Sequence, residues 1–240
     1  TRRASVKYVP SARPERWLKF IREITSRFDA GQPGAFVDRP ELAGYVKRAL
    51  GYALTGSTAE QKLFLAVGEG SNGKNVLLDT VREVMGDYAQ AVPLEVLVAS
   101  RWGQDAERAS PALASLAGTR LAVCSESRDG QKLDGALVKR HTGGDTMIAR
   151  RMRENSFEFQ ITHKLVMMTN WMPGLDQLDE ALRGRIHVIP FDVRWNRPGH
   201  PSRDSSLPDG DKLLQERLRG EQEGILAWLV EGAVAYYQLG

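Results

Sequence analysis

A glycine-rich loop stands between an apolar run and a helix-like run. Residues 63–67 are Leu-Phe-Leu-Ala-Val, residues 68–75 are Gly-Glu-Gly-Ser-Asn-Gly-Lys-Asn, and residues 76–81 continue as Val-Leu-Leu-Asp-Thr-Val. A buried strand that leads into such a loop at the start of a helix can hold a polyphosphate. The glycines let backbone N–H groups approach the phosphates, and the helix N-terminus favours anions. The pattern predicts a nucleoside triphosphate site with Lys74 on the terminal phosphates.

The same glycines allow two other interpretations. Gly68, Gly70 and Gly73 also fit the dinucleotide-binding pattern G-x-G-x-x-G, which needs an acidic residue about twenty positions later, at the end of a second strand. Asp87 has that spacing, but it follows Gly86, which is typical of a helix C-terminus, and no second strand intervenes. A glycine-rich turn without a ligand would require strand, helix and lysine to coincide by chance. The sequence therefore favours the phosphate site.

One position of the loop departs from the usual pattern. Ser or Thr normally ends such a loop and gives its hydroxyl to magnesium, whereas this chain has Asn75. An amide oxygen is still a hard ligand that Mg²⁺ accepts. Weaker metal binding, a water-bridged ion and loss of hydrolysis are the open alternatives. The predicted nucleotide-binding residues are Gly68, Gly70, Ser71, Asn72, Gly73, Lys74, Asn75 and Val76.

Length and composition indicate a globular chain. Its 240 residues are 42% hydrophobic and 26% charged, enough to bury a full core as one large domain or a domain with helical additions. The single cysteine, Cys124, excludes an internal disulfide framework and is typical of a structural thiol in a reducing compartment. No apolar run approaches the ~20 residues that span a bilayer, and the first residues lack the apolar segment of a signal peptide. We expect a soluble cytoplasmic protein without a membrane partner.

The chain divides into three zones. Residues 1–58 are predicted to be helical, with residues 38–41 typical of a helix start and Gly51 of its end. Residues 59–194 alternate apolar strands with helical stretches, as α/β domains do. Residues 195–240 begin with a Pro- and Gly-containing loop and end in two predicted helices. The helices of the first zone are predicted from two apolar stripes at helical spacing: Trp17, Ile21, Ile24 and Phe28, then Leu42, Tyr45, Val46, Ala49 and Leu50.

Two predicted strands end in polar residues. Residues 121–124 form a short apolar run that ends at Ser-Glu126, and residues 164–169 form another that ends at Asn170. A carboxylate beside a phosphate loop holds magnesium's water shell and polarises the attacking water, and an amide orients the water or binds the γ-phosphate. The alternatives are an exposed strand-end glutamate and a turn-forming asparagine ahead of Pro173. The choice depends on whether these strands lie next to the loop.

Basic residues gather in one segment of a chain whose formal net charge is only +3. Residues 139–164 contain six basic and three acidic side chains, a local excess equal to that of the whole chain. Two strand-like runs on either side of Glu154 and Asn155 predict a hairpin with arginines near its turn. Such arginines could grip the phosphates of a DNA strand, and a solvated charged hairpin is the alternative.

The order of these segments resembles the superfamily 3 helicases, specifically the ATPase domain of phage and plasmid primase-helicases. Several motifs in one order are far more specific than any one of them, and the resemblance covers most of the chain. The matching phrases are Gly68-Glu-Gly-Ser-Asn-Gly-Lys74, Arg120-Leu-Ala-Val-Cys-Ser-Glu126, Lys139 with Thr142-Gly-Gly-Asp145, Ala149-Arg150, Phe157-x-Phe159, Lys164-Leu165 with Thr169-Asn170, and Arg185-Ile186-x-x-Ile189-Pro190-Phe191.

This resemblance implies an α/β P-loop NTPase of the AAA+ kind, with a modified Rossmann core, a central mostly parallel sheet and helical segments at both ends. The core would be residues 59–194, and residues 1–58 could form a collar. The resemblance also implies a hexameric ring around single-stranded or fork DNA, with ATP and Mg²⁺ between neighbouring subunits. A primase domain would lie upstream in a longer chain of a phage or plasmid, in the cytoplasm of a bacterial host.

The resemblance also implies roles for individual residues. Lys74 would bind the phosphates, Glu126 the catalytic water and, with Asn75, the magnesium, and Asn170 would act as sensor. Arg185 would be the arginine finger that reaches a neighbour's γ-phosphate. The family usually has two adjacent arginines, whereas here a glycine precedes Arg185 and Arg183 is the second candidate. The residues implied to contact DNA are Lys139, Arg150, Arg151 and Arg153.

The function implied is an ATP-dependent DNA helicase motor, and two other functions remain open. A small-molecule kinase or regulatory triphosphatase would use the same loop without DNA, as a monomer in which Arg185 is dispensable. A non-catalytic DNA-binding or ring-forming module, for which Asn75 is the argument, would bind nucleotide and hardly turn it over. Neither alternative explains the hairpin or the spacing from Asn170 to Arg185.

Overall fold

A parallel β-sheet forms the centre of the molecule. The computed structural model describes residues 2–29, 35–98, 111–125, 132–175, 179–197, 199, 201 and 204–239. The five strands lie in the order β11-β3-β9-β5-β4, and all neighbours pair in parallel. They are β3 (Leu63–Val67), β4 (Ala89–Ala91), β5 (Leu121–Ser125), β9 (Lys164–Thr169) and β11 (Ile186–Pro190). The predicted α/β class with a parallel sheet is confirmed.

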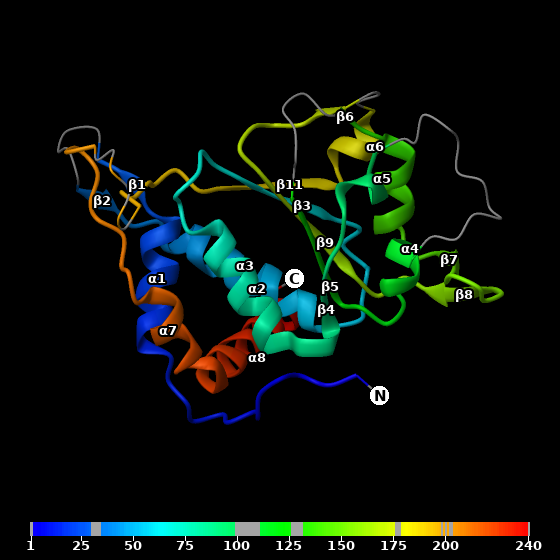
Figure 1. The fold of residues 1–240 in the computed structure, drawn as a ribbon, viewed down its shortest axis with the longest axis horizontal. Helices are drawn as coiled ribbons and strands as arrows, with labels where there is room; N and C mark the ends of the chain where they lie inside the picture. The colour runs from blue at the N-terminus through cyan, green and yellow to red at the C-terminus, as the bar shows by residue number, and fades with distance from the viewer. Residues whose placement is uncertain are drawn as a thin grey trace.

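Helices cover both faces of this sheet (Figure 1). They are α1 (Glu15–Thr25), α2 (Pro40–Leu54), α3 (Lys74–Met85), α4 (Pro111–Ser115), α5 (Gly135–Thr142), α6 (Glu180–Arg183), α7 (Leu214–Arg219) and α8 (Gln222–Leu239). In Figure 1, α1, α2, α3, α7 and α8 lie on one side of the sheet, and α4, α5 and α6 lie on the other. No helix in the described part of the chain is both long and apolar enough to cross a membrane.

Shorter elements connect or extend these layers. Two 3₁₀ turns are η1 (Gly86–Tyr88) and η2 (Leu94–Val96). Three two-stranded pairs are β1 (Arg27–Phe28) with β2 (Phe36–Val37), β7 (Thr146–Arg150) with β8 (Ser156–Gln160), and β6 (Lys132–Leu133) with β10 (Gly174–Leu175). The β7–β8 pair is antiparallel and has Arg150 opposite Ser156, so the predicted hairpin around residues 154 and 155 is confirmed.

Two apolar cores lie on the two faces of the sheet. Alternate residues of a strand point to opposite faces, so Phe64 and Ala66 pack with α1, α2, α3 and α8, whereas Leu63 and Leu65 pack with α5 and α6. Burial on both faces explains why the strands are continuous apolar runs in the sequence. Cys124 belongs to the second core, where burial raises the pKa of its thiol to about 12, as expected of a structural thiol.

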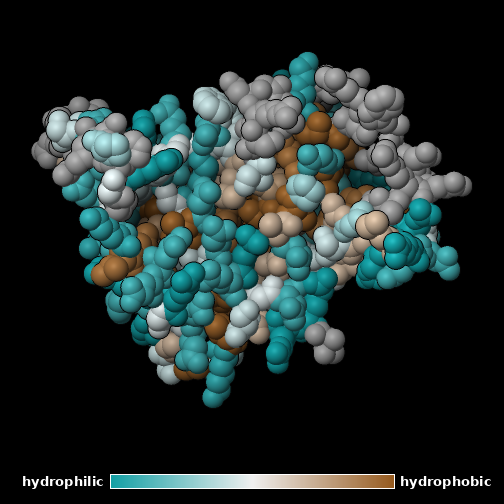
Figure 2. Space-filling model, viewed as in Figure 1, coloured by the Kyte–Doolittle hydropathy of each residue, from teal (hydrophilic) through white to brown (hydrophobic). Residues whose placement is uncertain are grey.

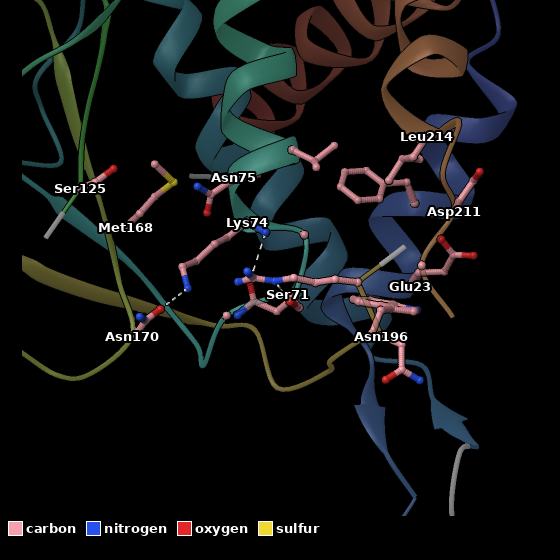
Figure 3. Close-up of a pocket in the computed structure, with 18 of the residues that line it drawn as sticks. Glu23, Ser71, Lys74, Asn75, Ser125, Met168, Asn170, Asn196, Asp211 and Leu214 are labelled. Atoms are coloured by element: carbon pink, nitrogen blue, oxygen red, sulfur yellow. Dashed lines mark hydrogen bonds between the residues drawn. The ribbon is translucent and has the colours of Figure 1, made fainter. Parts of the chain in front are cut away.

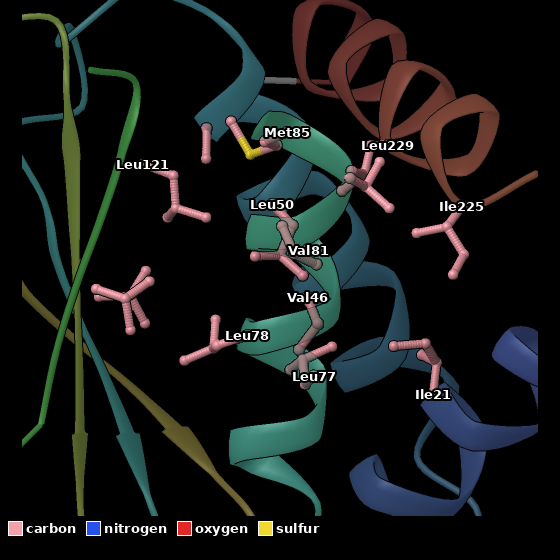
Figure 4. Close-up of a cluster of buried hydrophobic side chains, with 14 of the residues drawn as sticks. Ile21, Val46, Leu50, Leu77, Leu78, Val81, Met85, Leu121, Ile225 and Leu229 are labelled. Atoms are coloured by element: carbon pink, nitrogen blue, oxygen red, sulfur yellow. The ribbon is translucent and has the colours of Figure 1, made fainter. Parts of the chain in front are cut away.

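Helix α3 connects the sheet to the outer helices (Figure 4). Its buried residues Leu77, Leu78 and Val81 lie between Leu121 of the sheet and the helices α2, α1 and α8. The N-terminal and C-terminal helices therefore share one core with the helix that follows the glycine loop. The helices packed around α3 therefore hold in place the glycine loop that precedes it.

The first apolar stripe ends earlier than its spacing predicts. Helix α1 buries Trp17, Ile21 and Ile24, but it stops at Thr25 because Ser26 adopts an extended conformation. Phe28, predicted to continue the stripe, lies in β1 instead, where its ring stacks on Phe36 with centroids 5.4 Å apart. The helical prediction for Phe28 was wrong because helical spacing alone does not show where a chain leaves the helix.

Gly51 was predicted to end a helix, but α2 continues through it to Leu54. A Cβ atom at Gly51 would lie 2.2 Å from backbone atoms of Gly232 and Ala233 on α8. A Cβ at Gly232 would lie 2.2 Å from the carbonyl oxygen of Lys47 on α2. The glycine is required by the close crossing of two helices, and not by a helix end.

Two glycines of α2 give a matched test of this crossing. Gly51→Ala should lower the free energy of unfolding by about 1–3 kcal/mol, because the methyl group overlaps the backbone of α8. Gly44→Ala should raise it by about 0.5–1 kcal/mol, because its Cβ would meet only the end of Arg48 at 3.6 Å and alanine favours the helix. Urea unfolding of both variants measures the difference, and equal effects would contradict the close crossing.

Two histidines form a buried pair beside the second core. His141 on α5 and His163 before β9 are 1% and 2% exposed, and their Nδ1 and Nε2 atoms lie 3.4 Å apart. Burial, together with nearby Arg140, lowers the pKa of His141 to about 4. Burial, His141 and Lys164 lower the pKa of His163 to about 3. Both rings are therefore neutral in the folded chain at neutral pH.

This pair predicts a specific acid sensitivity. Below the unfolded pKa of 6.5 the unfolded chain binds protons that the folded chain does not, so stability falls as the pH falls toward about 4. Each histidine should contribute up to about 1.4 kcal/mol per pH unit to that slope. His163→Gln should reduce the slope of unfolding free energy between pH 6.5 and pH 5. An unchanged slope in this variant would contradict the neutral pair.

Lys164 does not belong to the basic surface predicted for the hairpin segment. It is 2% exposed, and its Nζ donates to the carbonyl oxygens of Thr55, Ser57 at 3.1 Å and Thr162 at 3.1 Å. Burial and then the neighbouring Arg120 lower the pKa of Lys164 to about 7. Counting charges along the sequence overestimated the positive charge available to DNA, because this lysine links the start of β9 to residues 55–57.

Candidate functional site

The glycine loop connects β3 to α3 and is tightly enclosed. Ser71 and Gly73 have left-handed φ angles of +58° and +86°, and Lys74 begins α3. A Cβ at Gly73 would lie 2.5 Å from the Cγ2 atom of Ile24 on α1, and a Cβ at Gly68 would lie 2.3 Å from the carbonyl oxygen of Phe191. The loop therefore fits between α1 and the end of β11 only with glycines at these positions.

This loop lies at the point where the connections of the sheet change direction. From β3 the chain runs through α3 to β4 at one edge, whereas from the adjacent β9 it runs through α6 to β11 at the other edge. Ligands of open parallel sheets bind in the crevice outside the carboxyl ends of two such strands. The backbone N–H of Gly68 donates to the carbonyl oxygen of Thr169 at 3.2 Å, which joins the two strand ends.

Lys74 and Asn170 meet in this crevice. Lys74 is 4% exposed, and its Nζ donates to Oδ1 of Asn170 at 2.9 Å and to the carbonyl oxygen of Gly68. Burial lowers the pKa of Lys74. Figure 3 shows the two side chains pointing toward one another at one end of a cavity. The structure thus brings together two residues that the sequence predicted for one site.

A cavity of about 630 Å³ extends from Lys74. Residues 70–76 of the loop line it, together with the strand ends at Ser125 and Thr169–Asn170. Its other walls come from the two ends of the chain and are formed by Arg16, Phe20, Glu23, Trp195, Asn196, Arg197, Gly210, Asp211 and Leu214. Its volume lies within the range of small-molecule sites. All the predicted nucleotide-binding residues except Gly68 therefore line one cavity, together with residues that no motif indicated.

The end of the cavity away from Lys74 carries opposite charges. A guanidinium N–H of Arg16 on α1 donates to Glu23 at 3.1 Å, and Arg16 Nε donates to Asp211 at 3.4 Å. Leu214 and Phe20 line the cavity beside them. Figure 3 shows Glu23, Asp211 and Leu214 on the side opposite Asn170 and Ser125. No local motif indicates this wall, because Arg16 and Asp211 are nearly 200 positions apart and only the fold brings them together.

The predicted metal ligands are only partly described. Glu126 lies outside the described residues, but Ser125, directly before it at the end of β5, lines the cavity, as does Asn75. Within the described residues, no group of three or more His, Cys, Asp or Glu side chains is arranged to hold a metal ion. Mg²⁺ commonly takes one or two protein ligands together with phosphate oxygens, so this donor set does not conflict with it.

Arg185 lies at the amino end of β11, whereas the glycine loop follows the carboxyl end of the neighbouring strand β3. Its carbonyl oxygen accepts from the N–H of Leu63 at the beginning of β3, and its Nη1 donates to the Thr142 hydroxyl at 2.9 Å. It does not line the cavity of its own chain. Lys139, which precedes this threonine on α5, is paired with Asp179. Neither basic residue contacts the site around Lys74.

The arginine-rich hairpin also lies away from the cavity. In Figure 1, β7 and β8 project from the side of the molecule opposite α1, and Figure 2 shows hydrophilic side chains at that end. Arg151 pairs with Glu154 at 3.2 Å and lies 4.6 Å from the centroid of the Phe157 ring. Arg150 ends β7, and Arg153 adopts a left-handed φ of +62° in the turn. The hairpin thus presents arginines at a projecting end.

The chain is similar to several known proteins. A family model described as a family of unknown function, DUF5906, matches residues 66–185, half of the chain. "Putative helicase L207/L206" of Acanthamoeba polyphaga mimivirus is 25% identical over 194 residues, which are 78% of this chain and 20% of that protein. "Putative helicase V13" of Sputnik virophage is 25% identical over 231 residues, which are 95% of this chain and 29% of that protein. The chain therefore spans less than a third of either relative.

The chain is also similar to a viral protein named as a primase and to a solved structure. "Putative primase C962R" of African swine fever virus (strain Badajoz 1971 Vero-adapted) is 26% identical over 182 residues, which are 75% of this chain and 19% of that protein. The apo structure of the NrS-1 C terminal region (305-718) aligns with a TM-score of 0.64 at 14% identity, covering 98% of this chain and 53% of that chain. At this identity, the structural likeness shows a shared fold.

Proposed function

The chain belongs to DUF5906, a family of unknown function, and from its site we propose that it is an ATP-dependent DNA helicase motor of viral replication. The observation that carries the proposal is the meeting of Lys74 and Asn170 at one end of a cavity lined by the glycine loop. Relatives from two viruses and a virophage, which are named "putative helicase" or "putative primase", support the replication role.

In this proposal the loop and α3 bind the triphosphate. Backbone N–H groups of residues 70–76 and the N-terminus of α3 hold the phosphate oxygens, and Lys74 exchanges its present acceptors for the terminal phosphates. Asn170 then orients the attacking water or contacts the γ-phosphate. Asn75 and Glu126 would hold Mg²⁺, which neutralises developing phosphate charge when bound.

We propose that the hairpin binds DNA, because of its position and its positive charge. Arg151 and Arg153 lie at a projecting turn, remote from α1 and from the cavity walls. Exposed arginines bind DNA phosphates without sequence preference, as a translocating motor requires. Arg185 does not line the cavity of its own chain, and in a ring we propose that it reaches a neighbouring subunit's nucleotide. The hexamer, the upstream primase domain and the host cytoplasm are further parts of this proposal.

Lys74→Met should lower ATP hydrolysis at least about a hundredfold, because it removes the charge at the terminal phosphates. Lys7→Met, which changes an exposed lysine of the N-terminal segment, should leave hydrolysis unchanged. A phosphate-release assay measures both variants. Full activity in Lys74→Met would contradict the proposed phosphate site.

Replacing both Arg151 and Arg153 with alanine should spare basal ATP hydrolysis but abolish unwinding and the stimulation by single-stranded DNA. Fork-unwinding and ATPase assays at several salt concentrations measure the three activities, because phosphate contacts make DNA binding salt-dependent. The double change Arg13→Ala and Arg219→Ala removes the same charge from exposed arginines elsewhere, and should have little effect. Normal unwinding by the hairpin variant would refute the DNA assignment.

Asn75 favours one alternative function, a nucleotide-binding module with little turnover. Its amide replaces the hydroxyl that usually binds magnesium in such a loop. Binding of nucleotide and DNA without measurable hydrolysis would support that alternative. Hydrolysis that ignores DNA would instead support a triphosphatase or kinase acting on another substrate.

A further inference from the structure

We propose that Arg197 supplies a second positive charge to the phosphates from within the same chain. This inference rests on the proposed function, because it requires the cavity to hold a nucleoside triphosphate. Arg197 lines the cavity, and its Nε donates to the hydroxyl of Ser71 in the glycine loop at 2.8 Å. No motif in the sequence indicated this residue.

The segment after β11 is bound to the glycine loop at successive positions. Arg194 pairs with Glu69 at 3.1 Å, and the N–H of Trp195 donates to the carbonyl oxygen of Ser71 at 3.0 Å. The contact from Arg197 to Ser71 follows two residues later. These contacts join the segment to the first half of the loop. The segment therefore lies beside the phosphate-binding end of the cavity.

The backbone before Arg197 is held in place by Asn196. This side chain is 7% exposed, and its amide group donates to the carbonyl oxygens of Asp204 at 2.9 Å and Leu207 at 2.8 Å, and accepts from the N–H of Asp204 at 2.9 Å. Its backbone N–H donates to Pro208 at 2.8 Å. The backbone that leads into Arg197 is therefore held in place, although the Arg197 side chain is exposed.

The guanidinium of Arg197 has donors available for an anion. Its Nε is occupied by Ser71, and within the described residues its two terminal nitrogens have no recorded hydrogen bond. A Cβ built at Gly70 would lie 3.7 Å from Nη2, so the guanidinium lies directly against the loop. A planar fork with two free N–H groups binds phosphate oxygens in a bidentate way.

Arg197 differs in this respect from the other arginine of the cavity. Arg16 is paired with the carboxylates of Glu23 and Asp211, which neutralise its charge. Arg197 has a hydroxyl as its recorded partner, so its charge is not neutralised by a described carboxylate. Together with Lys74 it gives the phosphate-binding end two cations, which a chain of phosphates would occupy better than a single phosphate.

The test is nucleotide binding to the whole chain by calorimetry, with a non-hydrolysable ATP analogue and AMP as probes. Arg197→Ala should weaken binding of the analogue about ten- to hundredfold and binding of AMP less than about threefold. Arg194→Ala is the matched control, since Arg194 pairs with Glu69 and does not line the cavity. It should change neither affinity by more than about threefold.

A second variant separates charge from structure. Arg197→Gln retains an N–H donor for the Ser71 hydroxyl but has no charge, so it should lose affinity for the analogue as Arg197→Ala does, while its melting temperature without nucleotide stays unchanged. Unchanged affinity in both variants, or an equal loss for AMP, would overturn the role of Arg197. If Lys74→Met still abolished binding in that case, the proposed function would stand. Failure of the unaltered chain to bind the analogue would overturn both.

Discussion

The parallel pairing of β3 with β9 determines where the site forms. In this register Val67 lies beside Thr169, so the residues that follow the two strands emerge together at the carboxyl ends of the strands. Lys74 at the start of α3 then reaches Asn170 without any further adjustment. A shift of either strand along the other would separate the two side chains, even with every local motif intact. The buried, β-branched and aliphatic residues of these strands are what hold this register.

Local patterns in the sequence predicted the elements correctly, and failed where tertiary contacts decided the outcome. The glycine loop, the strands at residues 121–125 and 164–169 and the arginine hairpin follow from apolar runs and turn residues that are close in the sequence. Gly51 was misinterpreted because the same residue type serves helix ends and close helix crossings, and only the position of α8 distinguishes them. Lys164 was misinterpreted because a count of charges does not distinguish buried from exposed lysines.

Only part of the candidate site was predictable, namely the glycine loop and the strand end at Asn170. Motif spacing led to Lys74 and Asn170, because both follow apolar strands that any parallel sheet would align. Arg16, Glu23 and Asp211 belong to no local pattern, since α1 and the segment after β11 come together only when both pack around α3. The carboxylate of Glu221 shows the same long-range link, because it accepts the N–H groups of Arg16 and Trp17 at 2.8 Å at the start of α1.

The walls contributed by the two chain ends affect how relatives of this protein should be compared. A truncated form lacking everything after Phe191 would retain every recognisable motif of the nucleotide loop, yet it would lack one wall of the pocket and also α8, which shares a core with α3. Motif content alone is therefore a poor measure of whether a family member can retain a ligand. Alignments that extend through both terminal helices carry that information, and fragments trimmed to the best-matching segment do not.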